Sequence, residues 1–71
     1  MMLSFAKLQK HLSPQEHQQI EDMPIPTIEQ AKQVLNMFDF SRDKSVEWVM
    51  SNLPMLKVYI KCARIYPELL I

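Results

Sequence analysis

The chain contains no glycine, and this absence restricts the turns that its 71 residues can form. Tight hairpins, phosphate-binding loops and the sharp turn beneath a catalytic serine rely on glycine, because it adopts positive φ angles without strain. Strand signals are also weak, since β-branched residues do not alternate with polar ones. The sequence therefore predicts an all-α fold, in a single helical domain that spans residues 1–71.

Five prolines and several capping signals mark where the helices begin and end. Segments 13–16 and 27–30 both have the capping-box pattern, in which a serine or threonine precedes a glutamate or glutamine by three positions. With the apolar spacing, these signals predict helices over about 2–12, 14–23, 28–38, 42–52 and 54–66. The second is poorly apolar, so we expect it to be short and loosely docked. A core of this size supplies only about 3–5 kcal/mol, so we expect dimerisation to complete this compact bundle of four or five short helices.

The segment 54–71 carries more apolar surface than one small core can use. Wound as a helix at about 100° per residue, its apolar side chains cover an arc of about 220°, twice a usual core-facing stripe. We assign the middle of this arc, around Val58, Cys62 and Ile65, to the domain's own core. The flank and the tail are expected to bind a partner protein, together with the tryptophan of the preceding helix. The predicted partner-binding residues are Trp48, Leu56, Tyr59, Ile60, Ala63, Tyr66, Leu69, Leu70 and Ile71.

One narrow edge of the same segment is cationic and consists of Lys57, Lys61 and Arg64. Such a stripe keeps an apolar helix soluble, and we interpret it as a charged rim beside the partner-binding face. The alternative is an ionic contact with an acidic patch on the partner. No apolar run reaches about eighteen residues, so no membrane span is expected. Because Cys62 is the only cysteine, disulfides are excluded and a cytoplasmic protein is predicted.

No pattern of side chains predicts a catalytic residue, a metal site or a cofactor. Segment 39–43 resembles the start of a calcium-binding loop, but Lys44 and Met50 replace the glycine and the final glutamate that such a loop requires. The two histidines and the single cysteine lack the spacing of metal ligands. Activated nucleophiles and convergent acid/base pairs are missing as well, so the chain is not expected to be an enzyme.

A helix-turn-helix regulator that binds DNA is the first alternative. The predicted helices 28–38 and 42–52 would place Arg42 and Lys44 at the start of a recognition helix. Asp43 opposes this reading, because it would face the phosphates, and so does the balance of eight basic against eight acidic residues. A structural subunit of a larger assembly is the second alternative.

The apolar excess therefore favours a small non-enzymatic regulator that binds and inhibits or modulates another protein through its C-terminal helix. We expect a homodimer whose client is a protein, and DNA is the less favoured partner. In size and character the chain resembles the small helical regulators encoded by phages and mobile elements, such as antirepressors. That resemblance implies a client among the proteins of transcription.

Overall fold

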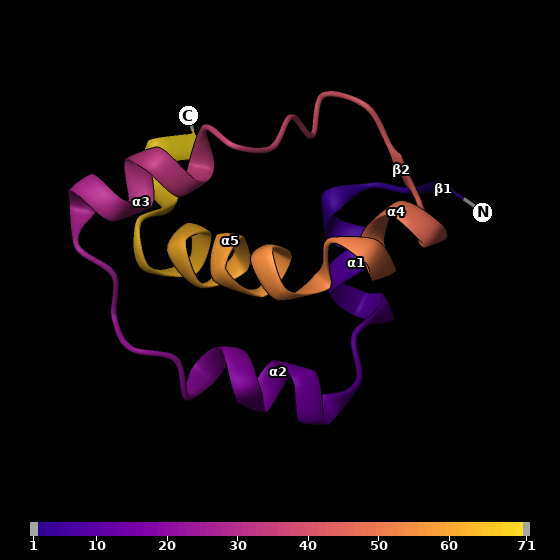
Figure 1. The fold of residues 1–71 in the computed structure, drawn as a ribbon, viewed down its shortest axis with the longest axis horizontal. Coiled ribbons are helices and arrows are strands. Elements are labelled where there is room, and N and C mark those ends of the chain that lie inside the picture. Colours follow the sequence, from indigo (N-terminus) through magenta and orange to yellow (C-terminus); the bar gives the residue numbers. More distant parts are fainter. Residues whose placement is uncertain (1, 71) are drawn as a thin grey trace.

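The computed structural model describes residues 2–70, and five helices dominate its architecture. Figure 1 shows α5 in the middle of the molecule, with α2 along one side, α3 along another, and α1 and α4 gathered near its first turn. The molecule measures 33 × 27 × 18 Å. Its elements are β1 (Met2–Leu3), α1 (Phe5–His11), α2 (Pro14–Glu21), α3 (Ile28–Leu35), β2 (Lys44–Ser45), α4 (Val46–Ser51), α5 (Leu53–Ile65) and the 3-10 helix η1 (Pro67–Leu70).

Hydroxyl side chains fix the first turns of four helices. Both predicted capping boxes are confirmed: the Ser13 hydroxyl accepts from the Glu16 amide at 3.2 Å, and the Thr27 hydroxyl accepts from the Gln30 amide at 3.2 Å. In return, each cap's own amide donates to the side chain three residues later, at 3.1 Å in both boxes. At the starts of α1 and α4, the hydroxyls of Ser4 and Ser45 also accept from the amide three residues later, but no reciprocal bond from the cap's own amide accompanies them. Local sequence therefore sets these helix starts, since each cap satisfies amides that have no partner inside the helix.

The helix ends also follow from the missing glycine. No residue between 2 and 70 has a positive φ angle, so the helices end without the left-handed residue that commonly terminates them. Asp22 and Asn36 end α2 and α3 in the right-handed helical region, and Leu12 ends α1 in an extended conformation.

The all-α prediction is wrong in one detail, because β1 and β2 form a two-stranded antiparallel pair. Met2 lies opposite Ser45, and Leu3 lies opposite Lys44. The two strands are far apart in sequence and need no tight turn, so the absence of glycine does not prevent their pairing. Leu3 is buried, and its packing against the core holds β1 beside the start of α4. The described chain is therefore mostly helical, with one short strand pair.

The connection between α3 and α4 is longer than the sequence predicted. Helix α3 ends at Leu35 rather than 38, and α4 begins at Val46 rather than 42. Phe38 and Phe40 are two residues apart, and both pack against the core, which an extended chain allows and a helix does not. The Ser41 amide donates to Asp39 Oδ1 at 2.9 Å, so this serine belongs to a turn and caps no helix.

This long connection overturns the helix-turn-helix geometry. Residues 36–45 separate α3 from α4 where the motif has a turn of three or four residues. Arg42 and Lys44 lie in that connection and not at the start of a recognition helix, and α4 has only six residues.

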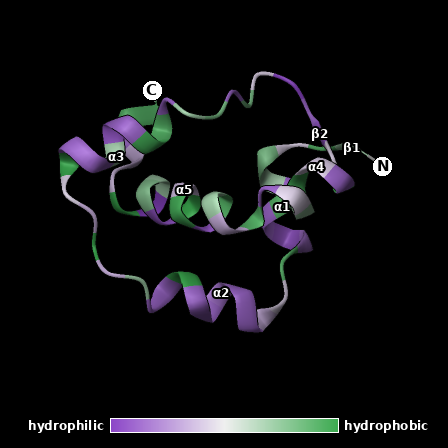
Figure 2. Cartoon of the chain, in the orientation of Figure 1, coloured by the Kyte–Doolittle hydropathy of each residue, from purple (hydrophilic) through white to green (hydrophobic). Residues whose placement is uncertain are grey.

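The main core cluster packs against α5 and receives side chains from β1, α1, α2, α4 and the α3–α4 connection, but none from α3, β2 or η1. Figure 2 shows α5 as largely hydrophobic and α2 as largely hydrophilic with a short hydrophobic stretch. Half-buried aromatic and aliphatic residues pack around the edge of this core cluster. The central members are Leu3, Leu8, Leu12, Ile20, Val49, Leu56 and Ile60.

Candidate functional site

The flank of α5 that was predicted to meet a partner faces the protein's own core. Leu56 and Ile60 are completely buried, and Tyr59 and Ala63 are 5% and 8% exposed. The assignment of these four residues to an exposed partner-binding face is therefore wrong. A helical period reveals a wide apolar arc but does not say which part of it the remaining elements will cover.

An aromatic cluster explains why this flank turns inwards. The Tyr59 ring packs against three phenylalanines, with ring centroids 5.4 Å from Phe5, 5.7 Å from Phe38 and 5.0 Å from Phe40. Burial raises the pKa of the Tyr59 hydroxyl above its ordinary value of 10.0. Aromatic pairs at these distances add to the stabilisation from buried area alone.

Trp48 belongs to the same cluster. It is half-buried, and its ring meets Phe38 and Phe40 edge-on at 5.6 and 6.1 Å. The Lys44 ammonium lies 5.2 Å from the centre of the Trp48 ring, within the range of a cation–π contact. Trp48, which was predicted to bind a partner protein, therefore has aromatic and cationic neighbours inside the chain.

The cationic stripe of α5 holds α2 in place. Lys57 Nζ donates to Gln19 Oε1 at 2.6 Å and lies 4.0 Å from Glu16 Oε2. Arg64 reaches Glu21 Oε1 at 3.4 Å. Its second terminal nitrogen lies 3.1 Å from His17 Nδ1; because a guanidinium only donates, this ring nitrogen is the acceptor. The acidic patch that the stripe meets is thus on this chain's own α2.

Lys61, between those two cations, is buried instead of forming an exposed rim. The residue is only 9% exposed, and its ammonium donates to the backbone carbonyl of Glu21 at 3.1 Å. That carbonyl lies in the last turn of α2, where unpaired carbonyls and the helix dipole favour a positive charge. The prediction of a solvent-facing charged rim is therefore wrong for Lys61.

The tail after α5 is anchored by one of the predicted partner residues. The Tyr66 hydroxyl donates to the Pro26 carbonyl at 2.8 Å and ties the end of α5 to the α2–α3 connection. Leu69 is half-buried, and Leu70 is 47% exposed in η1. Ile71, the last residue assigned to a partner, lies outside the described residues.

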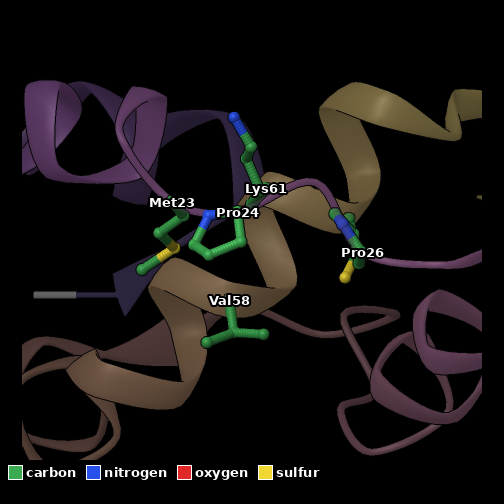
Figure 3. Close-up of a pocket in the computed structure, with 6 residues that line it drawn as sticks. Met23, Pro24, Pro26, Val58 and Lys61 are labelled. Carbon is green, nitrogen blue, oxygen red and sulfur yellow. The ribbon is translucent and has the colours of Figure 1, made fainter.

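A small pocket opens on the side of α5 that was assigned to the core. Its volume is about 190 Å³, and Val58, Lys61 and Cys62 form one wall. The other wall is the α2–α3 connection, as Figure 3 shows. The lining residues are Met23, Pro24, Pro26, Val58, Lys61 and Cys62. Ile65, which was also assigned to the core, is 36% exposed.

The α2–α3 connection shapes this pocket because two prolines alternate with an isoleucine. Pro24 and Pro26 line the pocket, whereas Ile25 between them is 72% exposed, the highest value among the large hydrophobic residues of the described chain. In an extended segment, successive side chains point to opposite sides. The Pro-Ile-Pro pattern was visible in the sequence, where it was interpreted only as a break between helices. Its alternation was the signal that could have identified the pocket.

The pocket shows no sign of reactive chemistry. Burial raises the pKa of the Cys62 thiol, and a protonated thiol is a poor nucleophile. Within residues 2–70, no group of three histidine, cysteine, aspartate or glutamate side chains is placed to hold a metal ion. The site therefore offers an apolar surface with one lysine side chain, that of Lys61, along its edge.

Two further findings concern the whole described chain. None of the helices within residues 2–70 has the length and hydropathy needed to cross a bilayer. Comparison of the chain with protein-family models, with curated proteins and with solved structures yields no match.

Proposed function

We propose that this protein is a small non-enzymatic regulator that binds another protein, and that the partner inserts an apolar side chain into the pocket beside α5. The pocket is the observation that carries the proposal, since α5 and the α2–α3 connection leave apolar surface uncovered there. The partner-binding role expected of the C-terminal helix is kept, but it moves to the opposite side of that helix.

The dimensions of the pocket support a side chain as its occupant. Pockets for drug-sized ligands measure roughly 300–1,000 Å³, whereas an apolar cavity of about 150 Å³ holds a benzene ring. At about 190 Å³, the pocket suits one leucine-sized or aromatic group. Two prolines stiffen one wall, and a wall that is already ordered loses little entropy when a partner binds.

The exposed isoleucine beside the pocket extends the proposed contact. Ile25 lies between two pocket-lining prolines with its side chain turned away from the pocket, so a partner that inserts a side chain there and also wraps around the α2–α3 connection contacts Ile25. An inserted anchor surrounded by weaker apolar contacts is the usual anatomy of a binding hot spot. The homodimer expected from the sequence stays a prediction, and Leu56 and Ile60, being buried, would not form its interface.

Quantitative capture of partners from native cells tests this proposal with two matched surface variants. Ile25→Asp places a charge beside the pocket, and Met50→Asp places one on α4; both original side chains are more than half exposed, at 72% and 54%. Both variants should melt within a few degrees of the unmodified chain. We expect Ile25→Asp to lose the captured partner and Met50→Asp to retain it. Equal capture by the two variants would show that the partner binds elsewhere.

A further inference from the structure

The α2–α5 interface contains one more cation than carboxylate. Lys57 faces Glu16 and Arg64 faces Glu21, and these are the two ion pairs within residues 2–70. Lys61 lies between them on α5 with a backbone carbonyl as its hydrogen-bond acceptor. The contacts across this interface therefore involve three positive side chains and two negative ones, while the Asp22 carboxylate at the end of α2 is exposed and accepts from Gln18 Nε2.

Lys61 is the most deeply buried of the three cations. Only 9% of the residue is exposed, whereas the side chains of Lys57 and Arg64 are 16% and 32% exposed. Buried charges in proteins are normally paired with an opposite charge, because desolvation of an unpaired ion is unfavourable. An ammonium group has three donors, and the Glu21 carbonyl uses one of them.

The same lysine forms one edge of the apolar pocket. In Figure 3 the side chains of Met23, Pro24, Pro26 and Val58 surround the pocket, and Lys61 runs along its edge with the nitrogen at the end away from Val58. A ligand that fills the middle with an apolar group and extends past this edge can place a second group beside the ammonium.

We infer that the partner recognised by this pocket carries an aspartate or glutamate next to the inserted apolar side chain, and that its carboxylate pairs with Lys61. This inference rests on the proposed function and names the chemistry of the partner's binding segment. The apolar group occupies the space between the α2–α3 connection and α5. The carboxylate supplies the negative charge that the α2–α5 interface lacks, and it accepts a hydrogen bond that the Glu21 carbonyl leaves available.

Two small probes of nearly the same shape, one with a charged carboxylate and one with a neutral amide, test the inference on the full chain. 4-Phenylbutanoate and 4-phenylbutanamide carry the same ring, and NMR titrations at low salt report the binding of each through the amides around Val58 and Cys62. We expect the carboxylate to bind about tenfold more tightly than the amide, because it accepts a charge-assisted hydrogen bond. Higher salt should reduce this preference.

Variants of two lysines on α5 then show which ammonium group causes the preference for the carboxylate probe. Lys61→Met keeps the apolar stem and removes the ammonium, so the two probes should bind it equally. Lys57→Met removes a cation that does not line the pocket and should keep the preference. Equal binding of both probes to the unmodified chain would overturn the carboxylate inference and leave the proposed pocket standing. If neither probe shifted the signals around the pocket, both the inference and the proposed binding site would fail.

Discussion

Two sides of α5 are covered by different chemistry. On one side, the aromatic cluster and the aliphatic core bury Leu56, Tyr59 and Ile60. Helix α2 adds one buried side chain, Ile20, to the same core, and hydrogen bonds and ion pairs from the cationic stripe link the rest of this helix to α5. Apolar burial is not screened by salt and contributes most of the stability of a small domain, whereas partly exposed ion pairs contribute little and are screened.

This difference predicts where the protein opens first. Helix α2 is flanked by extended segments and has few buried apolar side chains, which are the properties of a region that unfolds locally. The pocket is built on the edge of this weaker side. A partner that fills the pocket would therefore contact the less stable side of the fold, and its binding would stabilise α2 against local unfolding.

The largest expected effect comes from a pair of identical substitutions on α5. Ile60→Ala removes a completely buried side chain and should destabilise the fold by about 2–5 kcal/mol. Ile65→Ala, at 36% exposure on the same helix, should cost less than about 1 kcal/mol. Urea unfolding followed by circular dichroism measures both.

These two variants also separate the sequence-based account from the observed one, because Ile65 was assigned to the core and Ile60 to a partner. A larger loss of stability for Ile65→Ala would contradict the orientation of α5. A cooperative transition of the unmodified chain would count against its interpretation as a structural subunit that folds only within an assembly.

An intermediate effect is expected at the start of α2. Ser13→Ala removes the hydroxyl that accepts from the Glu16 amide and should cost about 1 kcal/mol. Ser51→Ala, at the exposed end of α4, removes no cap and serves as the control. Hydrogen exchange should speed up across α2 and stay unchanged in α5. Uniform acceleration in both helices would show that α2 opens only together with the core.

Much of the local structure could be predicted from the sequence because it depends on neighbouring residues. The boxes at 13–16 and 27–30 begin α2 and α3, and the prolines after α2 and α5 lie just beyond the helix ends. The poorly apolar character of α2 was also evident from its composition. In each case the deciding interactions span only three or four positions.

The orientation of α5 could not be predicted, because it depends on residues distant in the chain. Phe5, Phe38 and Phe40 determine which flank of α5 is buried, and the sequence placed none of them beside Tyr59. The connection 36–45 was misjudged for the same reason, since its extended form follows from the packing of two phenylalanines. The cationic stripe was recognised as a possible contact for an acidic patch, but that patch was sought on another protein.

The smallest expected effect concerns acid. The Ser13 amide donates to the Glu16 carboxylate and, together with the Ser13 hydroxyl and nearby Lys57, holds the pKa of this carboxyl below its ordinary value of 4.5. A carboxyl whose pKa is lower in the folded state stabilises the fold above the unfolded-state pKa. This contribution is lost as the pH falls from about 4.5 through the folded-state value. Because solvent screens the Glu16 carboxylate, we expect it to contribute only about a few tenths of a kcal/mol to the free energy of unfolding.

Protection factors of the α2 amides, which correct for the pH dependence of the intrinsic exchange rate, measure this acid effect between pH 6 and pH 3, and Glu16→Gln should abolish it. The pKa of Asp39 is also lowered, by the Ser41 amide, but that residue lies in the α3–α4 connection, so exchange within α2 separates the two groups. An unchanged response in Glu16→Gln would assign the acid sensitivity to another group.

The central claim is that α5 turns the Leu56–Tyr59–Ile60 flank inwards and that a small pocket beside Val58, on the opposite side of the helix, is open to a partner. Hydroxyl-radical footprinting of the unmodified, folded chain tests this directly, because tyrosine reacts rapidly with hydroxyl radicals wherever it is exposed. The account predicts slow modification of Tyr59, which is 5% exposed, and fast modification of Ile25 and Ile65, with Tyr59 becoming reactive in urea. Rapid modification of Tyr59 in the folded protein, together with protection of Ile65, would contradict the account.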